Sequence, residues 1–139
     1  MSLDAAIDGL RTRLTTMTGL TRTYADPPES ISEFPSLIVY GTGGVMYYTA
    51  SGGYSLHRLV ADIYLARQYL PETVDAAKPW PDRAFAVLKA DQTLGGAVSH
   101  IVWDITGGQG LNYRFLPLQY NTTTLFGVRI EVTVKVNES

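Results

Sequence analysis

The chain has 139 residues and a formal net charge of −2; 45% of its residues are hydrophobic and 17% are charged. These totals predict one globular domain, residues 1–139, and argue against an intrinsically disordered chain. Cysteine is absent, which excludes disulfides, thiolate metal sites and cysteine nucleophiles, and no cluster of lysine and arginine offers the cations that tight phosphate binding needs.

The N-terminal segment predicts an amphipathic helix that runs to about residue 17. Ser2 is a suitable N-cap and Gly19 a suitable stop. Apolar residues recur every three or four positions and share one face: Leu3, Ile7, Leu10, Leu14 and Met17. Acidic residues stand where a signal peptide needs cations, and no apolar run approaches a membrane span. We therefore expect a protein made in the cytoplasm with no membrane partner.

Proline and glycine mark the next part of the chain. Residues 21–36 contain three prolines and predict an extended connector into a short buried strand at 37–40. In residues 41–53, GTGGVMYYTASGG, two glycine clusters bracket four apolar or aromatic residues, which predicts a protruding hairpin arm or a mobile loop. Residues 54–67 predict a strand, with one face made of Leu59, Ala61, Ile63 and Leu65.

A second helical region is expected at residues 71–91. Pro79 and Pro81 exclude one straight helix, so we expect a short helical turn and then a helix from about residue 80 or 82 to Ala90. Phe85 lies at the margin of its apolar face, which consists of Trp80, Ala84, Val87 and Leu88.

The last third of the chain predicts three strands. The first two cover residues 97–105 and 111–118, separated by a glycine-rich turn at 106–110. The closing strand, residues 125–136, alternates strictly and would span about 40 Å at about 3.3 Å per residue. Its inward row is apolar: Val128, Ile130, Val132, Val134 and Val136. Its outward row, which we expect to meet another chain or a lumen, contains Arg129, Glu131, Thr133 and Lys135.

This order of elements predicts an α+β fold. A mainly antiparallel, mixed β-sheet, with two helices packed on one face and a protruding hairpin arm, satisfies the pattern. No internal repeat and no interdomain linker interrupts it.

The sequence offers no recognisable catalytic, metal-binding or cofactor-binding pattern. The two histidines, His57 and His100, have no acidic partner at a diagnostic spacing. Ser99 precedes His100 directly, so on a strand the two point to opposite faces and cannot act as nucleophile and base. None of the glycine clusters matches a phosphate-binding loop. We expect no enzyme activity and no cofactor.

Tyrosine is the one enriched residue type, with nine copies in the chain. Tyrosine is favoured at protein interfaces, where its ring excludes water and its hydroxyl finds a partner. Stacking on single-stranded nucleic acid is the alternative, but no basic groove accompanies it. We predict a subunit or partner interface made of the arm and the closing strand: Val45, Met46, Tyr47, Tyr48, Tyr54, Arg129, Glu131, Thr133 and Lys135.

The second half of the chain resembles a known family. A helix ending in Leu88-Lys89-Ala90-Asp91 is followed by a turn, Thr93-Leu94-Gly95-Gly96, and by a closing strand that opens with Phe126-Gly127. This arrangement is similar to the tail terminator, or tail completion, proteins of long-tailed bacteriophages. The resemblance covers about residues 70–136 well and the first 70 residues only in outline. The prolines inside the second helical region depart from the family pattern.

The resemblance implies a structural virion protein at the tail neck, a subunit of a hexameric ring. Such a ring caps the tail tube, ends its polymerisation and joins the tail to the head. The implied partners are further copies of the chain, the tail-tube protein and a head-completion or neck protein, while DNA passes through the lumen without specific binding. Another neck component, such as a head-completion or stopper protein, is the first alternative. A small ligand-binding α+β module is the second.

Overall fold

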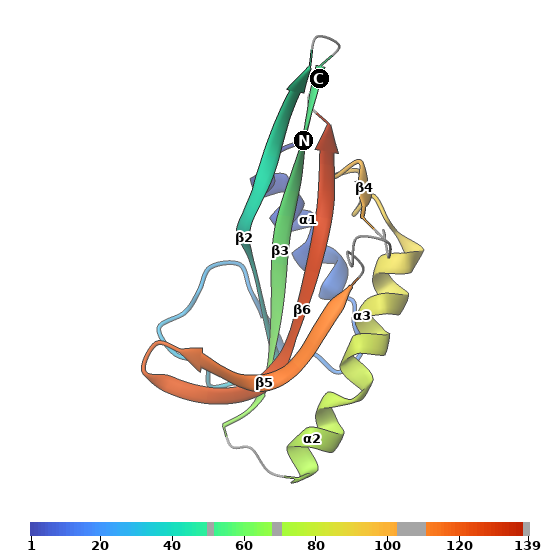
Figure 1. Cartoon of the computed structure of the whole chain (residues 1–139). Coiled ribbons are helices and arrows are strands. Elements are labelled where there is room, and N and C mark those ends of the chain that lie inside the picture. The colour runs from blue at the N-terminus through green and yellow to red at the C-terminus, as the bar shows by residue number, and fades with distance from the viewer. Residues whose placement is uncertain (50–51, 68–70, 103–110, 138–139) are drawn as a thin grey trace.

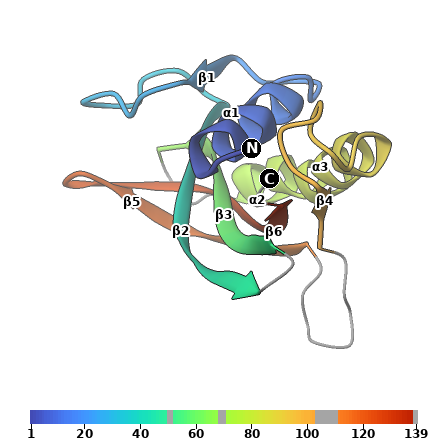
Figure 2. The same cartoon turned by 90° about the horizontal axis from the view of Figure 1, so that it is seen from above.

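A computed structural model describes residues 1–49, 52–67, 71–102 and 111–137 of the chain and confirms the α+β fold (Figure 1). The helices are α1 (Leu3–Leu14), α2 (Pro71–Ala77) and α3 (Pro79–Ala90). The strands are β1 (Arg22–Tyr24), β2 (Ser36–Thr49), β3 (Gly52–Ala66), β4 (His100–Ile101), β5 (Asn112–Tyr120) and β6 (Thr123–Asn137). Seen from above, the sheet curls and the helices lie on one side of it (Figure 2).

The sheet is mixed, with one parallel pair among otherwise antiparallel neighbours. Its order is β1-β2-β3-β6-β4, and β5 also pairs with β6. Since β5 pairs with residues 123–131 of β6 and β4 with residues 134–135, both lie along the same edge of β6. On the opposite side, β1 pairs only with residues 36–38 of β2. Within the described part of the chain, residues 39–49 therefore present a strand edge with no strand beside it.

The main core lies between the helices and the inner face of the sheet. Leu10 and Leu14 of α1 are fully buried, as the helical periodicity predicts. Leu3 is the exception and remains exposed, because α1 here faces Gly41, which offers no side chain to cover it. The strands contribute Leu37, Val39, Leu59, Ala61, Ile63, Val128, Ile130, Val132, Val134 and Val136.

The second helical region has the interruption that its prolines predict. Pro79 is the first residue of α3, where a missing backbone N–H costs nothing, and α2 ends two residues earlier. Trp80, Ala84 and Leu88 are buried against the sheet, as expected. Phe85 is 47% exposed and lines a small pocket with the buried Ile130, which agrees with its expected place at the margin of that face.

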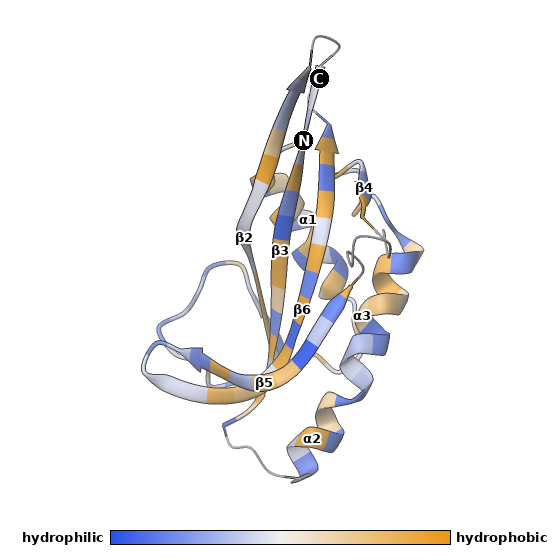
Figure 3. Cartoon of the chain, viewed as in Figure 1, coloured by the Kyte–Doolittle hydropathy of each residue, from blue (hydrophilic) through white to orange (hydrophobic). Residues whose placement is uncertain are grey.

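The closing strand is confirmed as the long, half-buried strand that the sequence predicts. Its alternation is visible as the banding of β6 in Figure 3, and all five residues of the predicted inward row are buried. β6 forms the middle of the sheet, with β3 on one side and both β4 and β5 on the other.

The strand expected at residues 97–105 is wrong for its first part. Residues 92–97 form a turn, and β4 comprises only His100 and Ile101. The backbone N–H groups of Ala97 and Val98 donate to the carbonyl oxygens of Leu94 and Thr93, at 3.4 and 3.1 Å, so these residues continue the preceding turn instead of entering the sheet. Residues 103–105 and the expected glycine turn at 106–110 lie outside the described residues.

A smaller cluster covers the lower part of the outer face, opposite the helices. The extended connector lies against the sheet here: Ile31 and Phe34 pack with residues of β2, β3, β5 and β6. These include Ile38, Tyr64, Leu118, Leu125 and Tyr120. Because this cluster ends near Tyr40, the upper part of the same face is left uncovered.

Candidate interface on the outer face of the arm

The glycine-rich segment continues β2 and β3 as a hairpin arm. The two strands remain paired up to Thr49 and Gly52, whereas β6 ends opposite Tyr54. Residues 48–49 and 52–53 therefore extend past the end of β6, and Figure 1 shows this part of β2 and β3 beyond α1 as well. The described part of residues 41–53 thus adopts the hairpin form of the two that the sequence leaves open.

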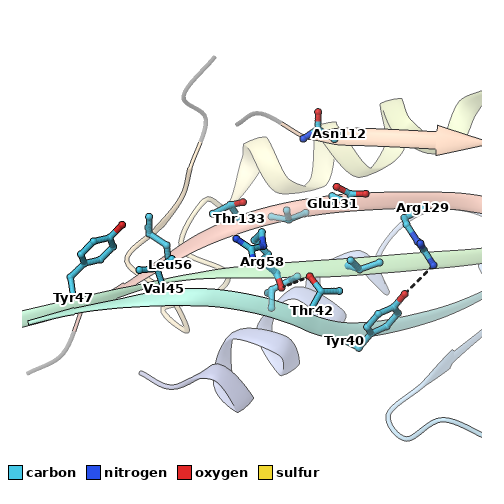
Figure 4. Close-up of a pocket in the computed structure, with 13 residues that line it drawn as sticks. Tyr40, Thr42, Val45, Tyr47, Leu56, Arg58, Asn112, Arg129, Glu131 and Thr133 are labelled. Atoms are coloured by element: carbon cyan, nitrogen blue, oxygen red, sulfur yellow. Dashed lines mark hydrogen bonds between the residues drawn. The ribbon is translucent and has the colours of Figure 1, made fainter. Parts of the chain in front are cut away.

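A bulge at the base of the arm decides which side chains point outward. The register of β2 against β3 shifts between Gly41 and Gly43. Beyond this shift, Val45 and Tyr47 share the outer face with residues of β3 and β6, and together they line an open groove (Figure 4). Since side chains alternate along a strand, Met46 and Tyr48 point to the opposite face.

The groove has a volume of about 410 Å³ and runs along β2, β3 and β6 from the arm toward the start of β5. Its lining mixes polar and apolar residues: Tyr40, Thr42, Val45, Tyr47, Leu56, Arg58, Leu59, Val60, Asn112, Arg129, Glu131, Val132 and Thr133. This open, mixed surface is suited to contact with a macromolecule more than to enclosure of a small ligand.

At the arm end of the groove, two tyrosines and a lysine form a stack. The rings of Tyr47 and Tyr54 lie 4.7 Å apart with an interplanar angle of 28°. The Nζ atom of Lys135 lies 4.5 Å from the centroid of the Tyr54 ring. Such contacts hold the rings and the charge in fixed positions on the surface.

At the other end of the groove, a buried carboxylate binds two of the side chains that line it. Asp62 is almost fully buried and accepts hydrogen bonds from Arg129 Nε at 2.9 Å and Nη2 at 3.2 Å. The Tyr40 hydroxyl donates to the same carboxylate at 2.8 Å and accepts from Arg129 Nη2 at 3.1 Å. All three polar groups are therefore satisfied, as a buried charge requires.

This network shifts the protonation equilibria of its members. Burial, together with the negative charge of Asp62, raises the pKa of Tyr40 to about 12. Burial and Asp62 also raise the pKa of Tyr64, which lies two residues from Asp62 on the same face. The hydrogen bonds to Asp62 raise the pKa of Arg129, so its charge is permanent.

The remaining cations of the groove differ in whether they have acidic partners. Arg114 of β5 forms an ion pair with Glu131 at 2.9 Å. Arg58 has no acidic partner among the described residues, and its guanidinium lies over Gly43, whose missing side chain leaves room for it. Arg58 therefore presents a free positive charge toward the bare edge of β2.

The structure brings together seven of the nine residues that the sequence predicts as an interface. Val45, Tyr47, Tyr54, Arg129, Glu131, Thr133 and Lys135 lie on or beside the groove. Met46 and Tyr48 do not join them, because the strand alternation places them on the other face. Tyr40, Arg58 and Asp62 also belong to this surface, although the sequence did not predict them as interface residues. The register between β3 and β6 places Asp62 beside Arg129. A single sequence contains no pattern that predicts this register.

The motif that resembles the phage family has a structural explanation in this chain. The Asp91 carboxylate accepts hydrogen bonds from the Gly95 backbone N–H at 2.9 Å and from the Thr93 hydroxyl at 3.1 Å, and it pairs with Arg13 of α1 at 2.7 Å. Burial opposes the charge, but these bonds outweigh it and lower the pKa of Asp91. Asp91 thus links the turn after α3 to α1.

Other chemistry is not assembled in the described ranges. No group of three histidine, cysteine, aspartate or glutamate side chains there is placed to hold a metal ion. His57 is buried in β3, and His100 is exposed on β4. Across the same residues, every helix is too short or too polar to span a bilayer.

Comparisons with solved structures find similar chains, whereas comparisons of sequence find none. No family model and no curated protein sequence matches the chain. Among solved structures, it is similar to a chain of a structure titled "Virion of native gene transfer agent (GTA) particle", with 14% sequence identity and a TM-score of 0.43. The match covers 99% of this chain and 96% of the other. A likeness at this level carries no conclusion about function.

Proposed function

We propose that this protein is a structural subunit of a phage-type virion and forms a ring, with six copies expected, at the end of the tail tube. The ring ends polymerisation of the tube and joins the tail to the head. The proposal starts from the resemblance of residues 70–136 to tail terminator proteins, including the Thr93-Leu94-Gly95-Gly96 turn and the Phe126-Gly127 pair.

One observation carries the proposal. A continuous outer surface on the uncovered end of the sheet combines stacked tyrosines, apolar side chains and charges at its margins. Aromatic residues in the centre with polar groups around them are typical of protein interfaces. Since no helix or connector of the described chain covers this surface, a partner chain is the natural cover.

The two lateral edges of the sheet differ, which supports a ring over a symmetric dimer. The edge of β2 is bare from residue 39 onward, whereas the edge of β6 is occupied by β4 and β5. Head-to-tail contact between unlike edges generates a closed ring when the rotation closes. A ring that held six copies would match the resemblance.

The charges of the groove suit a protein partner better than DNA, which we expect to pass through the ring without binding. Arg129 and Arg114 are neutralised by Asp62 and Glu131, so their attraction for phosphate is reduced. Of the groove and its margin, Arg58 and Lys135 alone lack an acidic partner among the described residues. Two cations per subunit bind DNA far more weakly than the clustered cations of DNA-binding proteins do.

The decisive experiment uses a tail-tube protein from the genome that encodes this chain. The tube protein is polymerised with and without the purified chain, and tube lengths and ends are examined by negative-stain electron microscopy. We expect shorter tubes with a ring at one end, and native mass spectrometry of disassembled ends should give six copies. A protein that stays monomeric and never binds tube ends would rule out the proposal.

A separate arm of the experiment addresses the alternative neck role. The chain is mixed with purified, DNA-filled heads that lack tails and with free tube protein. A terminator binds the tube first and then the head, whereas a head-completion or stopper protein binds heads without the tube. Binding to heads alone would replace the terminator role with the alternative.

A further inference from the structure

The two predicted interface residues that do not reach the groove form a second apolar surface. Met46 is 75% exposed and Tyr48 is 88% exposed, on the face of the arm that points to the same side as the helices. The helices end before the arm does, so nothing in the described chain covers these side chains (Figure 1). We name this surface the arm underside.

A small notch lined mainly by apolar and aromatic residues lies at the opposite side of the sheet. It has a volume of about 140 Å³ and lies between α3 and the start of β5, lined by Pro81, Asp82, Phe85, Leu111, Tyr113 and Ile130. Tyr113 is 55% exposed and lies beside the exposed Phe115, 5.6 Å from it between ring centroids. We name this surface the α3–β5 notch.

The positions of these surfaces prevent them from meeting within one molecule. Figure 1 shows β2 along one side of the sheet and α3 with the start of β5 along the other, and the view from above agrees (Figure 2). Two different patches on opposite sides of one subunit make a heterologous contact between copies, which closes into a ring when the rotation permits.

Charge favours the same pairing. Residues 41–49 and 52–58 include no acidic residue, and Arg58 directs its free charge toward the edge of β2. The notch contains Asp82, whose carboxylate forms no ion pair within the described residues. Opposite unpaired charges beside two apolar patches fix the orientation of a contact and oppose an arm-to-arm pairing.

We propose that the arm of one copy docks edge-on into the α3–β5 notch of the next copy, with Met46 and Tyr48 against Phe85 and Tyr113 and with Arg58 facing Asp82. This contact rests on the proposed ring and names the surfaces that build it. The outer groove is then left for contact with the tail-tube protein. A free, unpaired strand edge is a ready docking element, and no charged or proline residue protects β2 from residue 43 to residue 48.

Cysteine cross-linking tests the contact directly, because the natural chain has no cysteine to interfere. We expect the variant with both Tyr48→Cys and Tyr113→Cys, at a protein concentration raised to offset the loss of the two rings from the contact, to form a ladder of covalent oligomers that ends at the ring size when a short bismaleimide is added. An equal mixture of the two single variants should give a covalent dimer and nothing larger, and neither single variant alone should cross-link. The experiment is run on the free protein and on capped tube ends.

The control replaces the notch position by an exposed residue of α1. Tyr48→Cys combined with Thr12→Cys should give no ladder, since Thr12 is exposed but lies outside the notch. Cross-linking of Tyr48→Cys alone would indicate arm-to-arm contact and overturn the proposal. Absence of the ladder both in solution and on capped tubes would overturn it too, while leaving the terminator role intact. A ladder from a protein that does not cap tubes would support the contact and reject the role.

Charge exchange provides an independent measurement. We expect Arg58→Asp and Asp82→Arg each to raise the protein concentration needed for ring assembly by about threefold to tenfold, and the double variant to recover most of that loss. The change is measured by native mass spectrometry or by the protein concentration that halves tube length. Losses that simply add in the double variant would overturn the assigned orientation.

Discussion

The two ends of the β2–β3 hairpin are built from similar residues but have different surroundings. Near the start of β2, Leu37 and Val39 are buried beneath α1. Further along the same strand, Val45, Met46 and Tyr48 are equally apolar or aromatic and remain exposed. Apolar residues at the covered end stabilise the fold, whereas those at the arm gain little until a partner arrives. Substitutions at the covered end should therefore lower the stability of the fold, whereas substitutions in the arm should impair assembly and leave stability nearly unchanged.

Glycine positions provide the largest expected contrast between the two ends. A Cβ at Gly127 would overlap the carbonyl oxygen of Ile63 and lie 2.8 Å from Leu118 Cδ1. We expect Gly127→Ala to lower the free energy of unfolding by about 4 kcal/mol, because neither neighbour can move without disturbing the core. Chemical denaturation measures the change.

Gly44→Ala is the matched variant in the arm, where the new Cβ would overlap the carbonyl oxygen of Leu56. Because no helix packs on the arm, we expect a loss of about 1 kcal/mol or less and faster hydrogen exchange confined to arm amides. Equal global losses for the two variants would contradict the separation of the two ends.

Side-chain truncation gives the second contrast. Leu10 is fully buried between α1 and the sheet, so Leu10→Ala should destabilise the protein by about 3 kcal/mol through lost burial and a residual cavity. Tyr48→Ala should change stability by less than about 0.5 kcal/mol, because Tyr48 is almost fully exposed. Thermal unfolding compares the two, and only Tyr48→Ala should impair ring assembly. A substantial loss of stability in Tyr48→Ala would show that the arm belongs to the folding core.

The two ion pairs formed by arginines on the outer face predict a smaller difference in the free energy of unfolding. Arg129→Met leaves the buried carboxylate of Asp62 without its charged partner, and we expect a loss of about 2 kcal/mol. Arg114→Met removes an exposed pair with Glu131 and should cost less than about 0.5 kcal/mol. Equilibrium unfolding at pH 7 gives both values, and similar losses would mean that burial of Asp62 does not govern the pair.

Alkaline pH tests the buried network from the side of its tyrosines. Because the folded state raises the pKa of Tyr40 from 10.0 to about 12, folding favours the protonated phenol. This contribution is fully present below about pH 10 and is lost as the pH rises toward about 12. Stability should therefore fall across that window, and Tyr40→Phe should reduce the fall without abolishing it, since the pKa of Tyr64 is also raised. An unchanged fall in Tyr40→Phe would remove Tyr40 as a contributor.

The candidate site was predictable only in part. Period-2 alternation identifies the outward row of β6, and glycine clustering identifies the arm, which together include five of the residues that line the groove: Val45, Tyr47, Arg129, Glu131 and Thr133. The bulge between Gly41 and Gly43 is a one-residue shift with no distinct sequence pattern, and it reverses the faces of all later residues of β2. Strand alternation separates Met46 and Tyr48 from Val45 and Tyr47, and the bulge decides which of these two pairs faces the groove.

Local physical chemistry in the sequence determined the long alternating strand, the capped amphipathic helix at the N-terminus, the proline-broken second helical region and the α+β class. These depend on neighbours within one or two turns or along one strand. Tertiary structure alone decided the shortened β4, the buried Asp62 with its partners Arg129 and Tyr40, and the notch between α3 and β5. Each joins segments far apart in the chain, and strand register and packing, which no local pattern specifies, bring them together.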